Sequence, residues 1–184
     1  MIYFACLSTY GYSILVKTDY LPPIMGGAQG NQWKNVWIDF PIVNDQAYAR
    51  EMKVYYLFSL GYHVMSTAKH LYDSWYIMKR DFLEMLLHHV LTLALYMLSY
   101  MINITKVGSL VMFLHDIADV PVAGLKALVE TTSSKLTVVV GSIIMPGTWF
   151  YTRLWVFPQL IYFCFIKHPT PMIFPHLDVE GHRD

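Results

Sequence analysis

Five ionisable side chains stand inside two consecutive apolar stretches of the chain, and their types and spacing point to acid–base or nucleophilic chemistry. They are His88, His89, His115, Asp116 and Asp119. A carboxylate that orients an imidazole and favours its charged form is a common way to make that imidazole a general base or a nucleophile. These five residues are therefore the predicted catalytic set.

Helix geometry can bring the members of this set together. His115 and Asp119 are four residues apart, and Asp116 and Asp119 are three apart. All three therefore line one broad face of a helix. If the two apolar stretches pack against each other, either histidine of the first stretch can approach the aspartates of the second.

Two further residues are candidates for substrate binding. Thr92 lies four residues after His88 and shares its helix face, whereas His89 points about 100° away. Arg153 stands inside a long apolar run, where it is either a residue that extends to the membrane interface or a partner for an anion. Both readings of Arg153 remain open.

The stretches that carry the catalytic set are long enough to cross a bilayer. Residues 82–101 and 107–129 are mostly apolar and have about the length that a helix needs to span hydrocarbon. An ionisable group at that depth costs several kcal/mol, so it marks a functional site that faces a protein interior or a wet cavity. A histidine can also be a hydrogen-bond donor between helices. For His63 and His70, which share a helix face seven residues apart, the two readings are evenly balanced.

Composition supports a membrane protein. The 184 residues are 55% hydrophobic and 14% charged, whereas a soluble domain has about 25% charged residues. The net charge is zero, so nothing suggests nucleic-acid binding. Cys6 and Cys164 lie in apolar segments and predict buried thiols without a disulfide. The chain has neither Cys/His zinc spacing nor the repeated HxxxH and HxxHH boxes of a di-iron membrane oxygenase, so we expect no metal.

These patterns predict an all-α fold, a polytopic transmembrane helix bundle with about five membrane segments. The apolar blocks cover residues 1–16, 53–77, 82–101, 107–129 and 136–166. We expect Pro146-Gly147 and Pro158 to break the last block into a kinked span and a short or re-entrant piece. Residues 17–50 predict an interfacial loop with aromatic anchors. The expected domains are a membrane domain over 1–167, with the beginning of its first span cut away, and a polar tail over 168–184.

The stretch from Arg80 to Asp119 resembles the longevity-assurance motif of the TLC superfamily, as found in ceramide synthases. The motif begins with basic-Asp-Phe, continues through an HH pair followed by Thr, a Ser-Tyr and a basic-Val-Gly turn, and ends with HD and a second Asp. The matching residues here are Arg80-Asp81-Phe82, His88-His89 with Thr92, Ser99-Tyr100, Lys106-Val107-Gly108-Ser109, and His115-Asp116 with Asp119. Lys106 and Ser109 replace the usual Arg and Thr, and Pro121 stands where the family helix usually runs on.

The resemblance implies a sphingoid-base N-acyltransferase, that is, a ceramide synthase of the endoplasmic reticulum membrane. Such an enzyme joins a fatty acyl group from acyl-CoA, its co-substrate, to the amine of a long-chain base and needs no other cofactor. Membrane lipids surround it, and a homodimer or a heterodimer with related synthases is possible. In this reading His88 is the nucleophile or base, and the other histidines of the catalytic set are its partners. Asp116 and Asp119 orient an imidazole or bind the substrate amine.

Two other classes remain open. A non-catalytic TLC relative that acts as a lipid sensor or scaffold would share the fold, but the full set of histidines and aspartates argues against it. A proton-coupled transporter could use the same set as a relay. Such transporters often have paired repeats, and the sequence contains none.

Overall fold

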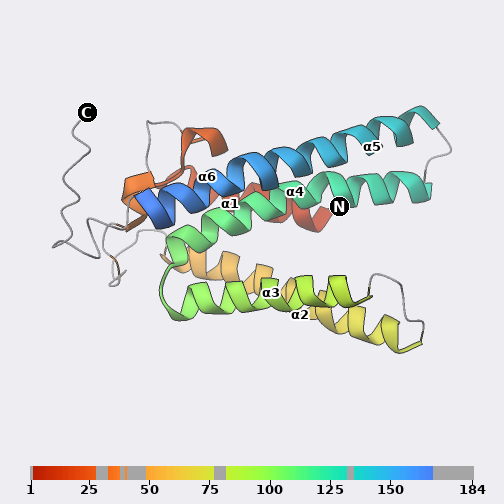
Figure 1. The fold of residues 1–184 in the computed structure, drawn as a ribbon, viewed down its shortest axis with the longest axis horizontal. Helices are drawn as coiled ribbons and strands as arrows, with labels where there is room; N and C mark the ends of the chain where they lie inside the picture. The colour runs from red at the N-terminus through yellow and green to blue at the C-terminus, as the bar shows by residue number, and fades with distance from the viewer. Residues whose placement is uncertain are drawn as a thin grey trace. The chain divides into compact units, whose positions relative to one another are not determined.

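The computed structural model describes residues 2–27, 33–37, 40, 49–76, 82–131 and 135–167 of the chain. They divide into two compact units, one of Met1–Asp39 with Leu110–Asp184 and one of Phe40–Ser109. Each unit is described by itself. Every regular element of the described residues is helical, and no strand occurs among them (Figure 1). The all-α class is therefore confirmed.

The unit Phe40–Ser109 contains two long antiparallel helices, α2 (Ala49–Tyr76) and α3 (Phe82–Met101) (Figure 1). Residues late in α2 contact the beginning of α3, and residues early in α2 contact its end. For example, Ser59 donates a hydrogen bond to the Tyr96 hydroxyl over 3.3 Å, while the His70 ring stacks on Phe82. This antiparallel register decides which α2 side chains meet the histidines of α3.

A left-handed residue closes α3. Asn103 has a φ of 60°, and the Ile104 N–H bonds to the Ser99 carbonyl over 2.9 Å. Asparagine tolerates the left-handed conformation better than most residues, and this geometry satisfies a carbonyl that the end of the helix leaves without a partner. The chain thus turns directly from α3 into α4 (Thr105–Thr131).

The other unit contains most of α4 and a long helical run at the C-terminal side. The run consists of α5 (Lys135–Phe150), a π-helical segment η3 (Tyr151–Val156), α6 (Phe157–Ile161) and a second π-helical segment η4 (Tyr162–Lys167). Its beginning contacts the later part of α4, where a Cβ on Gly141 would meet Leu125. Further along, Phe157 contacts His115, so the run and α4 are antiparallel (Figure 1).

The expectation that prolines break this run is wrong. The backbone is helical from Lys135 to Lys167, although Pro146 lies inside α5 and Pro158 near the start of α6. Proline costs a helix one hydrogen bond and creates a clash one turn earlier. In this run the wider π turn precedes Pro158, and the Phe157 N–H bonds to the Thr152 carbonyl five residues earlier. This local change of pitch lets the helix continue.

Three shorter elements of the described residues complete this unit, and one of them attaches the loop after α1 to the core of the unit. They are α1 (Ile2–Leu15) and the short 3₁₀ turns η1 (Pro23–Met25) and η2 (Trp33–Trp37). The Trp37 Nε1–H donates to the Cys164 carbonyl over 2.5 Å, and its ring meets Phe165 edge to face. Trp37 is 5% exposed, so it packs as a core residue and not as an anchor at a membrane interface.

Two of the described helices, Phe82–Met101 and Thr105–Val129, are long and apolar enough to cross a membrane. They contain the two segments that carry the predicted catalytic set. Helix α1 is apolar but shorter than a span. The expectation of about five membrane segments stays a prediction.

Candidate functional site

Four histidines lie on the helix pair α2 and α3. His63 and His70 come from α2, and His88 and His89 come from α3. The His70 ring lies 5.5 Å from the His89 ring, and the His89 ring lies 5.7 Å from the His88 ring. Among the residues described, no group of three or more His, Cys, Asp or Glu side chains is arranged to hold a metal ion.

His70 is held by Phe82 in two ways. Its Nε2 lies 3.3 Å from the Phe82 carbonyl oxygen, and its ring stacks on the Phe82 ring at 5.4 Å with an interplanar angle of 15°. A carbonyl oxygen only accepts hydrogen bonds, so Nε2 of His70 carries the hydrogen. The neutral ring then has its lone pair on Nδ1.

His88 and His89 differ in their surroundings within this unit. His88 is exposed, whereas His89 is half-buried. The Nδ1 atom of His89 is buried and has no hydrogen-bond partner among the described residues. Thr92 donates its hydroxyl hydrogen to the His88 carbonyl over 2.8 Å, so that hydrogen serves the helix backbone. A substrate would meet Thr92 as an acceptor, and its role in substrate binding stays a prediction.

His63 belongs to the same group of histidines. Its ring lies 5.0 Å from the Tyr96 ring, and it interacts electrostatically with His88 and His89. The seven-residue spacing of His63 and His70 predicted their shared face, but it did not show what that face contacts. The antiparallel register of α2 and α3 supplies the contact.

The second unit contains the remaining members of the predicted site on α4. His115 Nδ1 lies 2.7 Å from the carbonyl of Val111, one turn earlier. Nδ1 therefore carries a hydrogen, and in the neutral ring Nε2 has the lone pair. The His115 ring meets Phe157 edge to face at 5.7 Å. This histidine is thus fixed in one tautomer with Nε2 as its basic atom.

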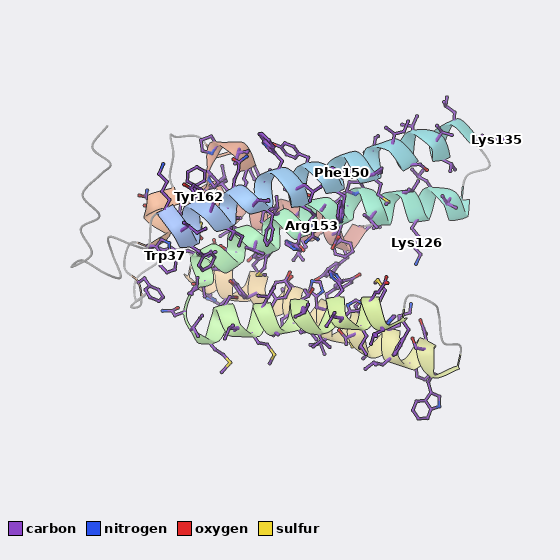
Figure 2. All side chains as sticks on the ribbon, in the orientation of Figure 1. Trp37, Lys126, Lys135, Phe150, Arg153 and Tyr162 are labelled. Atoms are coloured by element: carbon purple, nitrogen blue, oxygen red, sulfur yellow. The ribbon has the colours of Figure 1, made fainter. Side chains whose placement is uncertain are left out.

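The two aspartates differ in their exposure. Asp116 is 1% exposed, and Asp119 is half-buried. The Arg153 guanidinium interacts electrostatically with Asp119. Arg153 lies in η3 where the helical run passes along α4 (Figure 2). Of the two readings of Arg153, this electrostatic interaction favours the anion partner, with a protein carboxylate as one such anion.

Ser99 and Gly108, within the stretch from Arg80 to Asp119, lie where three helices pack together, which their residue types did not reveal. The Tyr56 hydroxyl donates to the Thr105 carbonyl over 3.1 Å and lies 3.4 Å from Ser99 Oγ. A Cβ at Gly108 would collide with the Tyr56 hydroxyl oxygen. Gly108 and Ser99 therefore let the start of α4 approach α2 and α3 closely.

The predicted site residues fall into two groups. His88, His89 and Thr92 lie in one unit, and His115, Asp116, Asp119 and Arg153 lie in the other. Within the first unit the His88 and His89 rings lie 5.7 Å apart, and within the second Arg153 interacts electrostatically with Asp119. The approach of a histidine of α3 to the aspartates of α4 stays a prediction. Arg80-Asp81 of the motif and the tail 168–184, with its predicted domain boundary, lie outside the described residues.

Comparison with known proteins gives a family match along nearly the whole chain. The family model described as the TLC domain, named for TRAM, LAG1 and CLN8, matches residues 1–177. The chain is 35% identical to human ceramide synthase 1 over 61% of this chain and 34% of that protein. It is 29% identical to the sphingosine N-acyltransferase lag1 of Schizosaccharomyces pombe, over 82% of this chain and 38% of that one.

A third relative matches at lower identity over more of the chain. Ceramide synthase hyl-1 of Caenorhabditis elegans is 23% identical over 94% of this chain and 43% of its own length. The chain therefore spans less than half the length of these curated relatives. No solved structure gives a significant match.

Proposed function

The chain belongs to the TLC-domain family, and on that premise we propose that it is a sphingoid-base N-acyltransferase, a ceramide synthase. It transfers a fatty acyl group from acyl-CoA to the amine of a long-chain base. The names of its relatives support this activity. The observation that carries the proposal is the pair of adjacent imidazoles on α3, His88 and His89, with ring centroids 5.7 Å apart on a helix apolar enough to cross a membrane.

In the proposed reaction His88 acts as nucleophile. A ring nitrogen of His88 attacks the thioester carbonyl and a C–N bond forms. The C–S bond breaks, CoA leaves as the thiolate, and an acyl-imidazole remains on the protein. The free amine of the long-chain base attacks that carbonyl, a C–N bond forms, and the imidazole leaves with its electron pair. An apolar surrounding keeps water from hydrolysing the intermediate.

The second reactant must lose protons before and during this step. A long-chain base is an ammonium in water, so it needs a base and an anionic partner. Nε2 of His115 has the lone pair to accept a proton, and Asp116 and Asp119 are the carboxylates of the same helix face. In this proposal His89 and His115 assist proton transfer, and the aspartates orient an imidazole or bind the amine. Arg153 and Thr92 contribute to substrate binding.

The proposal extends to the cellular setting. An enzyme that uses two substrates with long alkyl chains works in a membrane, and we propose the endoplasmic reticulum membrane, with about five membrane segments. Membrane lipids surround the helices, and a homodimer or a heterodimer with related synthases is the proposed assembly.

An acyltransfer assay tests the proposed function. Membranes that contain the expressed protein are incubated with a panel of acyl-CoAs and a long-chain base, and the ceramide formed is measured by mass spectrometry. His88→Ala should abolish transfer, because the loss of a nucleophile costs orders of magnitude in rate. It should leave membrane insertion intact, because an apolar residue lowers the insertion cost.

His168→Ala is the matched control, since it removes a histidine outside the stretch from Arg80 to Asp119. We expect it to be nearly silent. Equal transfer by the wild type and His88→Ala would refute the assignment of His88. If the wild-type protein forms no ceramide from any acyl-CoA of the panel, the acyltransferase proposal is refuted. The lipid-sensor, scaffold and transporter readings then remain.

A further inference from the structure

The histidines of α2 have no part in the proposed reaction, although one of them touches the predicted catalytic pair. His70 lies between two residues of α3. On one side its ring stacks on Phe82, and on the other it lies 5.5 Å from the His89 ring, with an interplanar angle of 47°. Such centroid distances correspond to ring contact. His70 is thus a residue of α2 whose ring contacts the predicted catalytic pair.

The position of His70 is itself fixed. The Phe82 carbonyl accepts a hydrogen bond from its Nε2 over 3.3 Å, and the Phe82 ring covers its face. A directional bond and a stacked ring both restrict the rotations through which the side chain could move away from its neighbour. His89 therefore packs against an imidazole, that of His70, whose own position is held by Phe82.

His89 lacks a comparable hydrogen bond on one of its ring nitrogens. Its buried Nδ1 has no hydrogen-bond partner among the described residues, so no bond at that atom sets the ring orientation. Two imidazoles lie at its sides, those of His70 and His88, at 5.5 and 5.7 Å. A reactive group must be held in its productive geometry by the packing and bonding of residues behind it.

We propose that His70 is a positioning residue for acyl transfer: anchored on Phe82, it fixes the His89 ring and through it the arrangement of the His88–His89 pair. This inference rests on the proposed function and adds a residue of α2 to it. The reacting atoms do not touch His70. Its effect is on geometry, and a small displacement of a reacting group can lower a rate by about a hundredfold.

Two variants separate the effect of the hydrogen bond between His70 and Phe82 from the effect of filling the space at position 70. His70→Ala removes both the hydrogen bond and the ring, whereas His70→Gln keeps a side-chain N–H group that can donate to the Phe82 carbonyl. We expect His70→Ala to lower kcat by about tenfold or more with little change in KM, and His70→Gln to recover most of the loss. A residue with a structural role only would lower the amount of folded protein and leave kcat per folded molecule unchanged.

A second measurement does not depend on activity. Diethyl pyrocarbonate modifies accessible imidazoles, and peptide mass spectrometry reports the rate at each histidine. If His70 fixes His89, His70→Ala changes the modification rate of His89 and His70→Gln restores it. Ser74→Ala is the control on the same helix, since Ser74 Oγ only donates to the His70 carbonyl one turn earlier, over 2.7 Å. This variant should match the wild type in both measurements.

The outcomes distinguish this inference from the proposed function. If wild type is active and His88→Ala is dead, but both His70 variants match wild type in kcat and in His89 modification, the positioning role is overturned and the proposed function stands. Equal losses in Ala and Gln variants that track the loss of folded protein also overturn it. If the wild type shows no transfer, the proposed function fails, and an unchanged modification rate of His89 in His70→Ala overturns the positioning role independently.

Discussion

At the scale of single residues, backbone carbonyls fix the tautomers of two histidines, His70 and His115. The Val111 carbonyl holds a hydrogen on Nδ1 of His115, and the Phe82 carbonyl holds one on Nε2 of His70. Each bond leaves the other ring nitrogen as the atom that can accept a proton, and that atom is Nε2 in His115 and Nδ1 in His70. Helix carbonyls thus fix the tautomer of an imidazole in this chain, as a carboxylate does in many catalytic pairs, but they add no negative charge.

The carboxylate of Asp119 gives a prediction at the same scale. Asp119→Asn keeps the size and hydrogen-bonding capacity of the side chain and removes the charge that interacts with Arg153. If that charge binds the amine or orients an imidazole, acyl transfer should fall by about a hundredfold or more. The measurement is the initial rate of ceramide formation at saturating substrates. A variant with a wild-type rate would exclude a role for the charge.

At the scale of elements, the sequence predicted the helices better than their partners. The apolar segment 82–101 coincides with α3, and 107–129 lies inside α4, because length and hydrophobicity determine such helices directly. The continuity of the run past Pro146 and Pro158 was missed, since no local pattern reveals a π turn. The contacts of His70 could not be predicted either. Helical spacing shows which residues share a face of α2, but the residues that this face contacts depend on the register of α2 against α3.

Gly108 provides a prediction for the packing of elements. Gly108→Ala should lower the stability of the protein by about 1–3 kcal/mol, because its Cβ would collide with the Tyr56 hydroxyl. Thermal unfolding of the purified protein in detergent measures the effect as a lower Tm. Tyr56→Phe removes the hydroxyl, so the double variant should regain part of the loss relative to the two single changes. Strictly additive losses would show that the hydroxyl is not the obstacle.

At the scale of the whole molecule, the predicted catalytic set is divided between two compact units. The sequence predicts that a histidine of α3 approaches an aspartate of α4, since the proposed reaction needs both kinds of group at one substrate. Helix α4 starts in one unit and continues in the other, where it carries His115, Asp116 and Asp119.

Crosslinking tests that approach. In a background with Cys6→Ser and Cys164→Ser, the pair His88→Cys and Asp116→Cys should be joined by a short bifunctional maleimide, and mass spectrometry should find the linked peptides. The control pairs His88→Cys with Lys126→Cys, an exposed position later in α4. Equal or stronger linkage in the control pair would contradict the predicted approach.

The π-helical segment Tyr151–Val156 has a consequence for how this protein can vary. A π turn contains about one residue more than an α turn, so the phase of every later side chain depends on the number of residues in the segment. Deleting one of them would rotate the later part of the helical run by about 100° relative to the earlier part. Arg153, which interacts electrostatically with Asp119, and Phe157, whose ring meets the His115 ring, would no longer face α4 together. Substitution of the exposed residues Leu154 and Trp155 keeps the helical phase of the run, whereas an insertion or deletion in this segment disturbs both interactions at once.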